Sequence, residues 1–185
     1  MRTFLAADID EKTKSQIISL LETFKKSETG IKWVSPDGLH ITLYFFGEVK
    51  EPGLEALESM INESVKEISP FSVLVGGLSG FPSLKKPRVI WAGVDNPSHE
   101  LETIFSSVRQ NITKMGLRVN KEKRSYTPHI TMGRVKRRVS SDILKKIDEL
   151  KDREFGRYQV NNVVLYKSTL TSKGAVYEPL KVFNL

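Results

Sequence analysis

Two short motifs in this chain combine residues that could carry out chemistry together. They are His40-Ile41-Thr42-Leu43 and His129-Ile130-Thr131-Met132. An imidazole titrates near neutral pH and can give or accept a proton, and a hydroxyl can donate a hydrogen bond to a phosphate oxygen. Two such motifs suit paired acid–base catalysis on a phosphate bound between them. Chance places threonine two residues after two of three histidines only on the order of one time in a hundred.

The remaining histidine provides a contrast. His99 follows Pro97-Ser98 at a predicted helix start and has no threonine two residues later, so we expect it at the surface. The two motifs lie 129 − 40 = 89 residues apart, close to half of the 185-residue chain. This spacing suggests two related lobes, each contributing one strand.

Each motif lies in a predicted strand, over 39–46 and over 126–135. Side chains alternate between the two faces of a strand, so histidine and threonine share one face and their aliphatic neighbours share the other. If the two strands face each other across a cleft, two imidazoles and two hydroxyls converge there.

The other elements follow from hydrophobic periodicity and from capping and turn residues. We predict helices over 10–26, 52–68, 96–115 and 140–150, and further strands over 3–9, 31–34, 71–78, 88–94, 156–169 and 176–183. Helices and strands alternate, but not as a regular βαβ series. This order favours an α+β fold with largely antiparallel sheets.

Composition excludes several classes of protein and site. Hydrophobic residues make up 39% of the chain and cysteine is absent, which indicates a globular protein without disulfides, thiol nucleophiles or cysteine zinc sites. No apolar run approaches the length of a membrane span, and no secretory signal is visible. We expect a cytoplasmic protein that does not bind membranes. Histidine–threonine pairs without clustered carboxylates do not make a metal site, so we expect no metal and no cofactor.

Positive charge is concentrated in one segment. The formal net charge is +7, and residues 118–138 contain eight basic residues and one acid, Glu122, giving 8 − 1 = +7. A local basic excess suggests a polyanionic partner, whereas a charge run alone is more often a solvated loop. The basic residues are Arg118, Lys121, Lys123, Arg124, Arg134, Lys136, Arg137 and Arg138.

The motifs and their surroundings resemble a known family. Paired His-x-Thr-x motifs at this separation are similar to those of the 2H phosphoesterase superfamily. The stretches Asp-Gly-Leu-His-Ile-Thr-Leu-Tyr-Phe-Phe-Gly and Thr-Pro-His-Ile-Thr-Met-Gly-Arg resemble its bacterial and archaeal branch, the RNA 2′,3′-cyclic phosphodiesterases, also called 2′-5′ RNA ligases. The similarity extends over the whole chain, including Trp33-Val34 and the stretch 89–93.

The resemblance implies a fold, an activity and four residue roles. It implies one domain, 1–185, of two intertwined, pseudo-symmetric lobes with the active site in the groove between them. His40 would donate a proton to the leaving ribose oxygen, and His129 would activate water. Thr42 and Thr131 would hold the phosphate. The expected reaction is metal-independent hydrolysis of RNA 2′,3′-cyclic phosphate ends, or of nucleotide cyclic phosphates, to 2′-phosphates by a monomer.

A further set of residues could complete the site. Relatives often carry a phosphate-contacting arginine at the position of Arg134. Strict alternation points Arg134 away from His129, so a bulge or strand end at Gly133 is needed to turn it inward. Tyr44 and Phe46 share the His40 face by parity, and Tyr126 precedes the second motif. We expect these rings to stack on a base, although Phe46 is equally suited to the core.

Two alternatives remain open. The same acid–base pair could run a 2′-5′ RNA ligase or a 2′-5′ phosphodiesterase. A non-catalytic RNA-binding module would use the basic segment, but would not need two imidazoles.

Overall fold

The computed structural model describes residues 1–27, 30–122, 125–172 and 174–185. The helices are α1 (Glu11–Ser27), α2 (Leu54–Val65), α3 (Glu100–Lys114) and α4 (Ser141–Asp148), with short 3-10 turns at Pro36–Gly38 and Glu51–Gly53. The strands are β1 (Arg2–Asp8), β2 (Ile31–Trp33), β3 (His40–Glu48), β4 (Phe71–Phe81), β5 (Val89–Asp95), β6 (His129–Val135), β7 (Glu154–Val160), β8 (Asn162–Leu170) and β9 (Ala175–Asn184).

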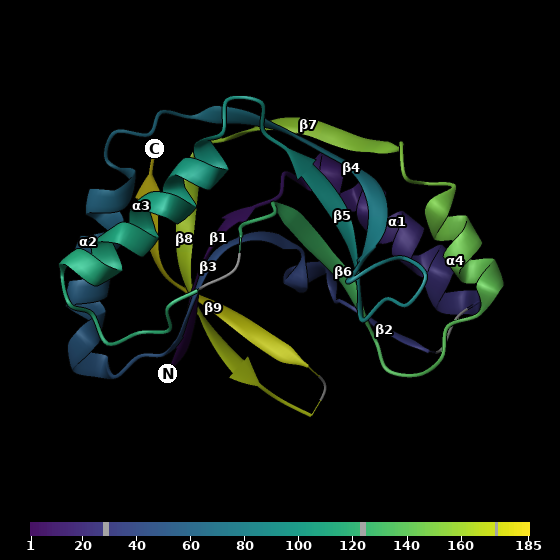
Figure 1. The fold of residues 1–185 in the computed structure, drawn as a ribbon, viewed down its shortest axis with the longest axis horizontal. Helices are drawn as coiled ribbons and strands as arrows, with labels where there is room; N and C mark the ends of the chain where they lie inside the picture. The colour runs from purple at the N-terminus through teal and green to yellow at the C-terminus, as the bar shows by residue number, and fades with distance from the viewer. Residues whose placement is uncertain (28–29, 123–124, 173) are drawn as a thin grey trace.

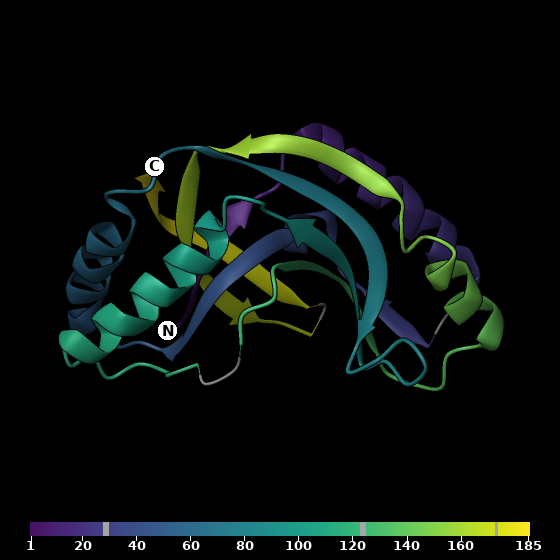
Figure 2. The ribbon, with the colours of Figure 1, turned by 45° about the horizontal axis from the view of Figure 1, so that its top comes forward.

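The described strands form one antiparallel sheet with the order β7-β4-β5-β6-β3-β1-β8-β9, and β2 pairs with β6. The sheet is strongly curved, and the helices lie outside it at its two ends (Figures 1 and 2). Helices α2 and α3 cover the end that contains β9 and β3, and α1 and α4 cover the end that contains β7 and β4. The predicted α+β fold with antiparallel pairing is confirmed.

Side-chain oxygens accept amide hydrogen bonds at the starts of three helices, although α3, predicted from residue 96, begins at Glu100 with His99 at the N-cap position. The Asp10 carboxylate accepts a hydrogen bond from the Thr13 amide, the Asn96 side chain accepts from the Leu101 amide, and the Ser140 hydroxyl accepts from the Ile143 amide. Each cap satisfies an amide that the first helical turn leaves unpaired. No helix within the described residues is long and apolar enough to cross a membrane.

Two strand predictions need correction. The predicted strand over 156–169 is two strands, β7 and β8, which lie far apart in the sheet order because the chain crosses between its halves near Asn161. Residues on both sides of the crossing have strand character, so their pattern gives no sign of the break. The second motif strand begins at His129 rather than Tyr126, since Pro128 has no amide hydrogen for a ladder.

Both motif strands contain a β-bulge at the same distance from their histidine. Against β1, the partner of Leu5 is Tyr44 and that of Ala6 is Thr42, so Leu43 is the extra residue. Against β5, the partner of Ile90 is Gly133 and that of Trp91 is Thr131, so Met132 is the extra residue. Beyond each bulge the side-chain alternation is inverted, which changes the face that later residues occupy.

Position 133 requires glycine because side chains of β2, which pairs with β6, lie close to its backbone. A Cβ at this position would lie 2.7 Å from Ile31 Cγ2 and 2.8 Å from Trp33 Cε3, both inside van der Waals contact. We therefore expect Gly133→Ala to lower the free energy of unfolding by roughly 1–3 kcal/mol. Urea denaturation measures the change.

Gly53→Ala is the matched control. The added Cβ meets only Val49 Cγ1 at 3.7 Å, an ordinary contact, and the backbone φ of −93° suits alanine. An equal loss of stability in both variants would contradict the close-approach explanation.

Candidate active site

One bridge between β3 and β6 places the two motifs side by side. Ile41 pairs with Ile130, and both side chains are fully buried in the core. In an antiparallel pair, this register puts His40 opposite Thr131 and Thr42 opposite His129, all on the face away from the isoleucines. The strands are therefore neighbours in one sheet, rather than separate strands facing each other across a cleft.

The four motif side chains thus occupy the corners of a rectangle. Residues directly opposite each other in an antiparallel pair lie about 5 Å apart, and diagonal neighbours lie about 7–8 Å apart. The two histidines are on a diagonal, and so are the two threonines. A tetrahedral phosphate fits over the centre of such a rectangle, with one imidazole on each side of it and a hydroxyl near each imidazole.

Each histidine is held by a backbone group two residues before it. His129 Nδ1 lies 2.7 Å from the Thr127 carbonyl oxygen, and the His40 ring is hydrogen-bonded to the Gly38 backbone. Because a carbonyl can only accept, the hydrogen bond places a proton on Nδ1 of His129. The other ring nitrogen, Nε2, is then the atom that can take up a proton from a bound molecule.

Aromatic rings enclose both imidazoles. Phe4 stacks on His40 with ring centroids 4.9 Å apart, and the Tyr177 edge meets the same imidazole at 5.2 Å. Around His129, Phe81 and Trp91 make edge contacts at 5.2 and 6.1 Å. These rings limit imidazole rotation and remove water from the imidazole faces.

Enclosure changes the acidity of both histidines. Burial is the main cause that lowers the pKa of His40 to about 4, and the neighbouring His129 lowers it further, against the Gly38 hydrogen bond. Burial also lowers the pKa of His129, against the Thr127 hydrogen bond, and the charge of Arg134 adds to the lowering. Without a bound anion, both rings are therefore neutral at pH 7.

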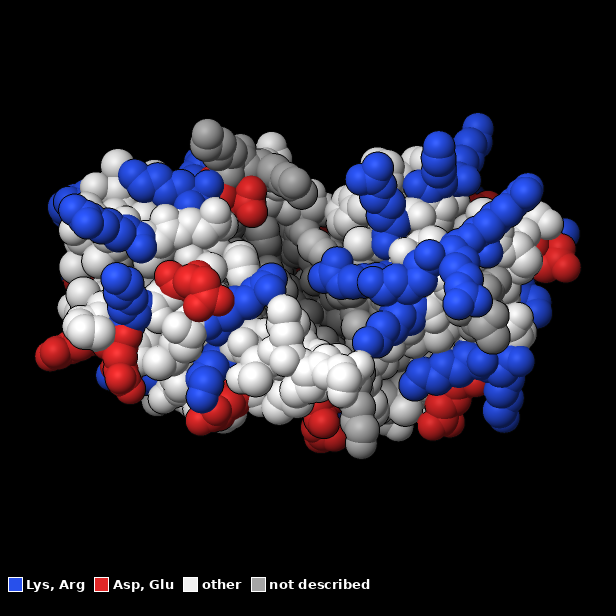
Figure 3. Space-filling model, turned by 90° about the horizontal axis from the view of Figure 1, so that it is seen from below, with Lys and Arg blue, Asp and Glu red and all other residues white. Residues whose placement is uncertain are grey.

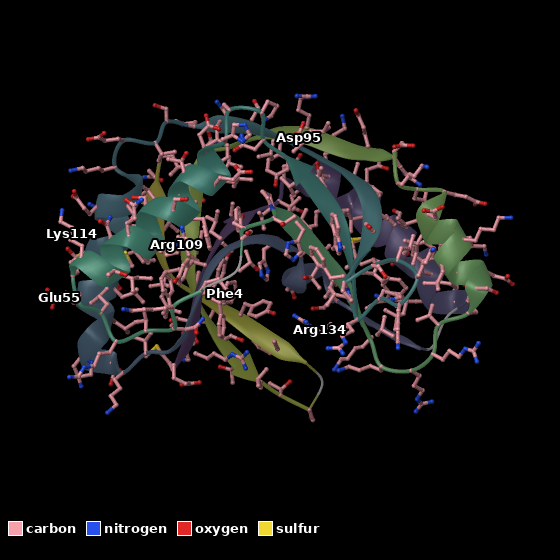
Figure 4. All side chains as sticks on the ribbon, viewed as in Figure 1. Phe4, Glu55, Asp95, Arg109, Lys114 and Arg134 are labelled. Carbon is pink, nitrogen blue, oxygen red and sulfur yellow. The ribbon has the colours of Figure 1, made fainter. Side chains whose placement is uncertain are left out.

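Arg134 lies on the same side of β6 as His129, because a bulge is present as required, at Met132 rather than at the expected Gly133. The bulge at Met132 buries both Met132 and Gly133 and turns Arg134 to the side of His129. Its side chain is exposed, and its charge acts on the His129 imidazole. In Figure 4, Arg134 and Phe4 both lie in the middle of the molecule, between the helices at its two ends.

The prediction that Tyr44 and Phe46 stack on a base is wrong. Both are buried, at 2% and 0% exposure, and the Tyr44 hydroxyl accepts a hydrogen bond from the Glu122 amide. The reason is the bulge at Leu43, which reverses the parity on which the prediction relied. Phe45 instead lies on the face that was predicted for Tyr44 and Phe46. The Arg2 guanidinium lies over its ring, 4.8 Å from the centroid.

Tyr126, also predicted to stack on a base, makes structural contacts within the protein. Its ring stacks on Phe105 with centroids 4.9 Å apart, and its hydroxyl donates to the Thr42 carbonyl oxygen at 3.1 Å. This hydrogen bond ties the loop before β6 to the first motif strand. Tyr126 thereby supports the position of Thr42, while one face of its ring is already covered.

The enclosing rings come from strands that the motifs do not identify. Phe4 lies on β1 and Tyr177 on β9, whereas Phe81 and Trp91 lie on β4 and β5. In the sequence, each of these rings is only an aromatic residue in or near a predicted strand. Such a residue more often belongs to the hydrophobic core than to a functional site. Their proximity to a histidine depends on strand order, which local pattern does not determine.

The remaining predictions concern His99, metal and the basic segment. His99 begins α3 with an exposed side chain, as predicted. Within the described residues, no three histidine, aspartate or glutamate side chains gather as a metal site requires. The basic segment is not one patch: residues 118–122 lie beside β3, where the Asn120 amide donates to the Phe46 carbonyl, and 134–138 lie at the end of β6. Lys123 and Arg124 lie outside the described residues.

The lowered pKa of His40 predicts a pH dependence of stability. The unfolded chain binds a proton near pH 6.5, whereas folded His40 binds it only near pH 4. Stability is therefore complete above pH 6.5 and falls as the pH drops toward 4, by up to about 3 kcal/mol for this residue. His40→Gln should show a smaller fall in urea denaturation between pH 7 and pH 4.5. An equal fall in wild type and His40→Gln would contradict the assignment.

Comparison with known proteins agrees with the geometry. The family model described as the 2′-5′ RNA ligase superfamily matches residues 13–171. A protein of Methanothermobacter thermautotrophicus, named RNA 2′,3′-cyclic phosphodiesterase, is 36% identical over 186 residues, covering 100% of this chain and 99% of the relative. A protein of Methanocaldococcus jannaschii with the same name is 39% identical over 182 residues, covering 98% and 99%.

Solved structures share the complete fold. The crystal structure of TT0787 of Thermus thermophilus superposes with a TM-score of 0.85 at 25% identity, covering 100% of this chain and 98% of that one. The crystal structure of E. coli LigT complexed with 3′-AMP has a TM-score of 0.81 at 25% identity, covering 100% and 97%. The matched family model and the full-length relatives establish that this chain belongs to the 2′-5′ RNA ligase superfamily.

Proposed function

We propose that this protein is an RNA 2′,3′-cyclic phosphodiesterase that hydrolyses the cyclic end to a 2′-phosphate. The observation that carries the proposal is the diagonal placement of His40 and His129 across the β3–β6 pair, with a threonine beside each. In-line displacement at phosphorus brings the nucleophile and the leaving oxygen to opposite sides, so acid and base must also lie opposite each other. The names of the full-length relatives supply the substrate class.

In the proposed reaction, His129 Nε2 takes a proton from water as the water oxygen attacks phosphorus. The bond from phosphorus to the ribose 3′-oxygen breaks, and His40 protonates that oxygen as it leaves. The products are a 2′-phosphomonoester and a 3′-hydroxyl, and the two histidines end with their protonation states exchanged. Each proton transfer typically contributes a factor of about 10²–10⁴ to the rate.

The low pKa of His40 in the free protein fits this cycle. A general acid must carry a proton when the substrate is bound, and a phosphodiester carries one negative charge at neutral pH. An anion placed between the two imidazoles favours the protonated form of the nearer one and raises its pKa. Substrate binding thereby supplies the charge that converts a neutral pair into an acid and a base.

Thr42, Thr131 and Arg134 complete the proposed site. The two hydroxyls lie at the other corners of the rectangle, where they can donate to the non-bridging phosphate oxygens. Charge on those oxygens increases in the transition state, and the Arg134 guanidinium beside His129 is suited to stabilise it. Arginine is favoured for this task because its planar donors match two phosphate oxygens at once.

Product analysis tests the proposed function directly. An oligoribonucleotide ending in a 2′,3′-cyclic phosphate is incubated with the protein in EDTA, and the products are separated and identified. We expect a 2′-phosphate end and undiminished turnover, because the proton transfers use side chains alone. A 3′-phosphate product, or turnover that requires an added divalent ion, would contradict the mechanism. A joined product with an added 5′-hydroxyl strand would identify the ligase alternative.

The two histidines can be distinguished by the leaving group. A ribose alkoxide is a poor leaving group and needs a proton, whereas nitrophenolate leaves readily without one. We expect His40→Ala to lose roughly 10²–10⁴-fold in kcat on a cyclic phosphate and to recover much of this on a nitrophenyl phosphodiester. His129→Ala should remain impaired on both substrates, because water still needs its base.

His99→Ala provides the control and should match wild type on both substrates. Recovery of the His129 variant instead of the His40 variant would mean that the two roles are exchanged. Recovery of neither would contradict acid–base catalysis by this pair.

A further inference from the structure

Three segments that are distant in the sequence meet beside the active site. The amides of Lys136 and Arg137 donate to the Gly30 carbonyl at 2.8 and 3.1 Å, and the Val135 amide donates to the Arg88 carbonyl at 2.9 Å. These hydrogen bonds join residues 30–36, 82–88 and 130–141, which contain no aspartate or glutamate. We call their eight cations the basic face: Lys32, Lys85, Lys86, Arg88, Arg134, Lys136, Arg137 and Arg138.

The basic face contains a groove at its outer end. The groove has a volume of about 920 Å³. Four of the cations line it, its other lining residues are apolar or hydroxyl-bearing, and none of its lining residues is acidic. Those residues are Lys85, Lys86, Arg137, Arg138, Pro87, Val135, Val139, Ser140, Ser141 and Leu144.

Within the described part of the chain, the cations of the basic face have no acidic partners. None of the eight takes part in an ion pair found among those residues. All eight side chains are exposed. Mutual repulsion of unpaired cations is unfavourable, and a polyanion that binds them removes it.

The basic face is continuous with the active site. Figure 3 shows lysine and arginine side chains gathered on one half of the molecule, from the edge of the central hollow outward. Arg134 stands at the inner end, beside His129. Along β6, the six residue-to-residue steps from His129 to Val135 span about 20 Å. A single nucleotide bound at the histidines does not reach the outer groove, but a strand of several nucleotides does.

We propose that the groove lined by Lys85, Lys86, Arg137 and Arg138 binds the sugar-phosphate backbone of the RNA strand that precedes the cyclic end. This inference rests on the proposed function and adds that the protein selects polynucleotide ends over mononucleotides. Neutralising backbone phosphates releases counterions, which favours binding at low salt. Once the cyclic end is bound, its own strand is present at high effective concentration near the groove.

The lining favours a flexible single strand. Apolar side chains of Pro87, Val135 and Leu144 lie among the cations, so sugars and unstacked bases can contact them while phosphates meet the charges. A rigid duplex presents its phosphates on the outside and keeps its bases stacked inside, so few base surfaces can contact the apolar lining of the groove. The groove thus matches a strand whose bases are unpaired near its 3′ end.

The test compares substrates of increasing length in two variants. The first replaces Lys85, Lys86, Arg137 and Arg138 by glutamine and leaves Arg134 intact. The control replaces four exposed lysines outside the basic face by glutamine, namely Lys12, Lys50, Lys114 and Lys151. For each protein, kcat/KM is measured on 2′,3′-cyclic phosphates from one to ten nucleotides long, at several salt concentrations.

For wild type and control, we expect kcat/KM to rise with length and then level off. For the groove variant, we expect a loss of roughly 10- to 100-fold on the decanucleotide at low salt, and a log–log salt slope shallower by about 3. The mononucleotide should be turned over at the wild-type rate by all three proteins. Equal length dependence in wild type and groove variant would overturn the inference, as would an equal loss on the mononucleotide.

A binding measurement separates this inference from the proposed function. Fluorescence anisotropy with a labelled decanucleotide bearing a 3′-phosphate requires no turnover. Weaker binding by the groove variant alone supports the groove even if wild type hydrolyses no cyclic phosphate, in which case the proposed function fails and the groove stands. If the groove variant affects only a second, 5′-hydroxyl strand added in competition, the groove belongs to that strand and the inference is wrong.

Discussion

The active face depends on the pairing of Ile41 with Ile130. This single bridge joins β3 and β6, and through them the two halves of the sheet. It buries both isoleucines and turns the four motif histidine and threonine side chains to the opposite face. A slip of one residue in either strand would place that strand's isoleucine on the solvent side and its histidine in the core. The burial of apolar surface that stabilises the fold therefore also selects the register that the site needs.

The two bulges extend this arrangement. A regular strand would carry the active face along its whole length, and Tyr44 would then be exposed beside His40. Instead, the extra residues Leu43 and Met132 reverse the alternation three residues beyond each histidine. In β3 the reversal turns the Tyr44 side chain into the core, and in β6 it turns the Arg134 side chain to the face that carries His129. A bulge at the same distance from each histidine thus has two effects. It ends the histidine-bearing face of β3, and it adds the Arg134 cation to that face of β6.

Enclosure of the histidines links stability to function. Aromatic contacts hold each imidazole in one orientation, and the accompanying loss of water lowers the pKa of both. Neutral imidazoles leave the basic face as the main local positive charge, which attracts an anion. In the proposed mechanism, an anion bound between the rings favours the protonated imidazole that burial disfavours. The same burial makes the folded protein sensitive to acid, since protonation of His40 is easier in the unfolded chain.

Local sequence is sufficient for much of this protein. The paired His-x-Thr motifs identify the four central residues, and alternation places them on one face because side chains in a strand alternate whatever its neighbours are. The helix caps at Asp10 and Ser140 follow from side-chain chemistry within one turn. The need for a bulge before Arg134 follows from parity together with the resemblance, which expects Arg134 beside the phosphate.

Only the tertiary structure decides which strands become neighbours. Sheet order brings Phe4 and Tyr177 to His40, separates β7 from β8, and assembles the basic face from three distant segments while dividing the basic run 118–138. The bulge at Leu43, one of two irregularities of β3 against β1, sends Tyr44 and Phe46 to the core and has no signal in β3 itself. These features depend on contacts between residues far apart in the chain, and the side-chain pattern within a strand is the same whichever strand lies beside it.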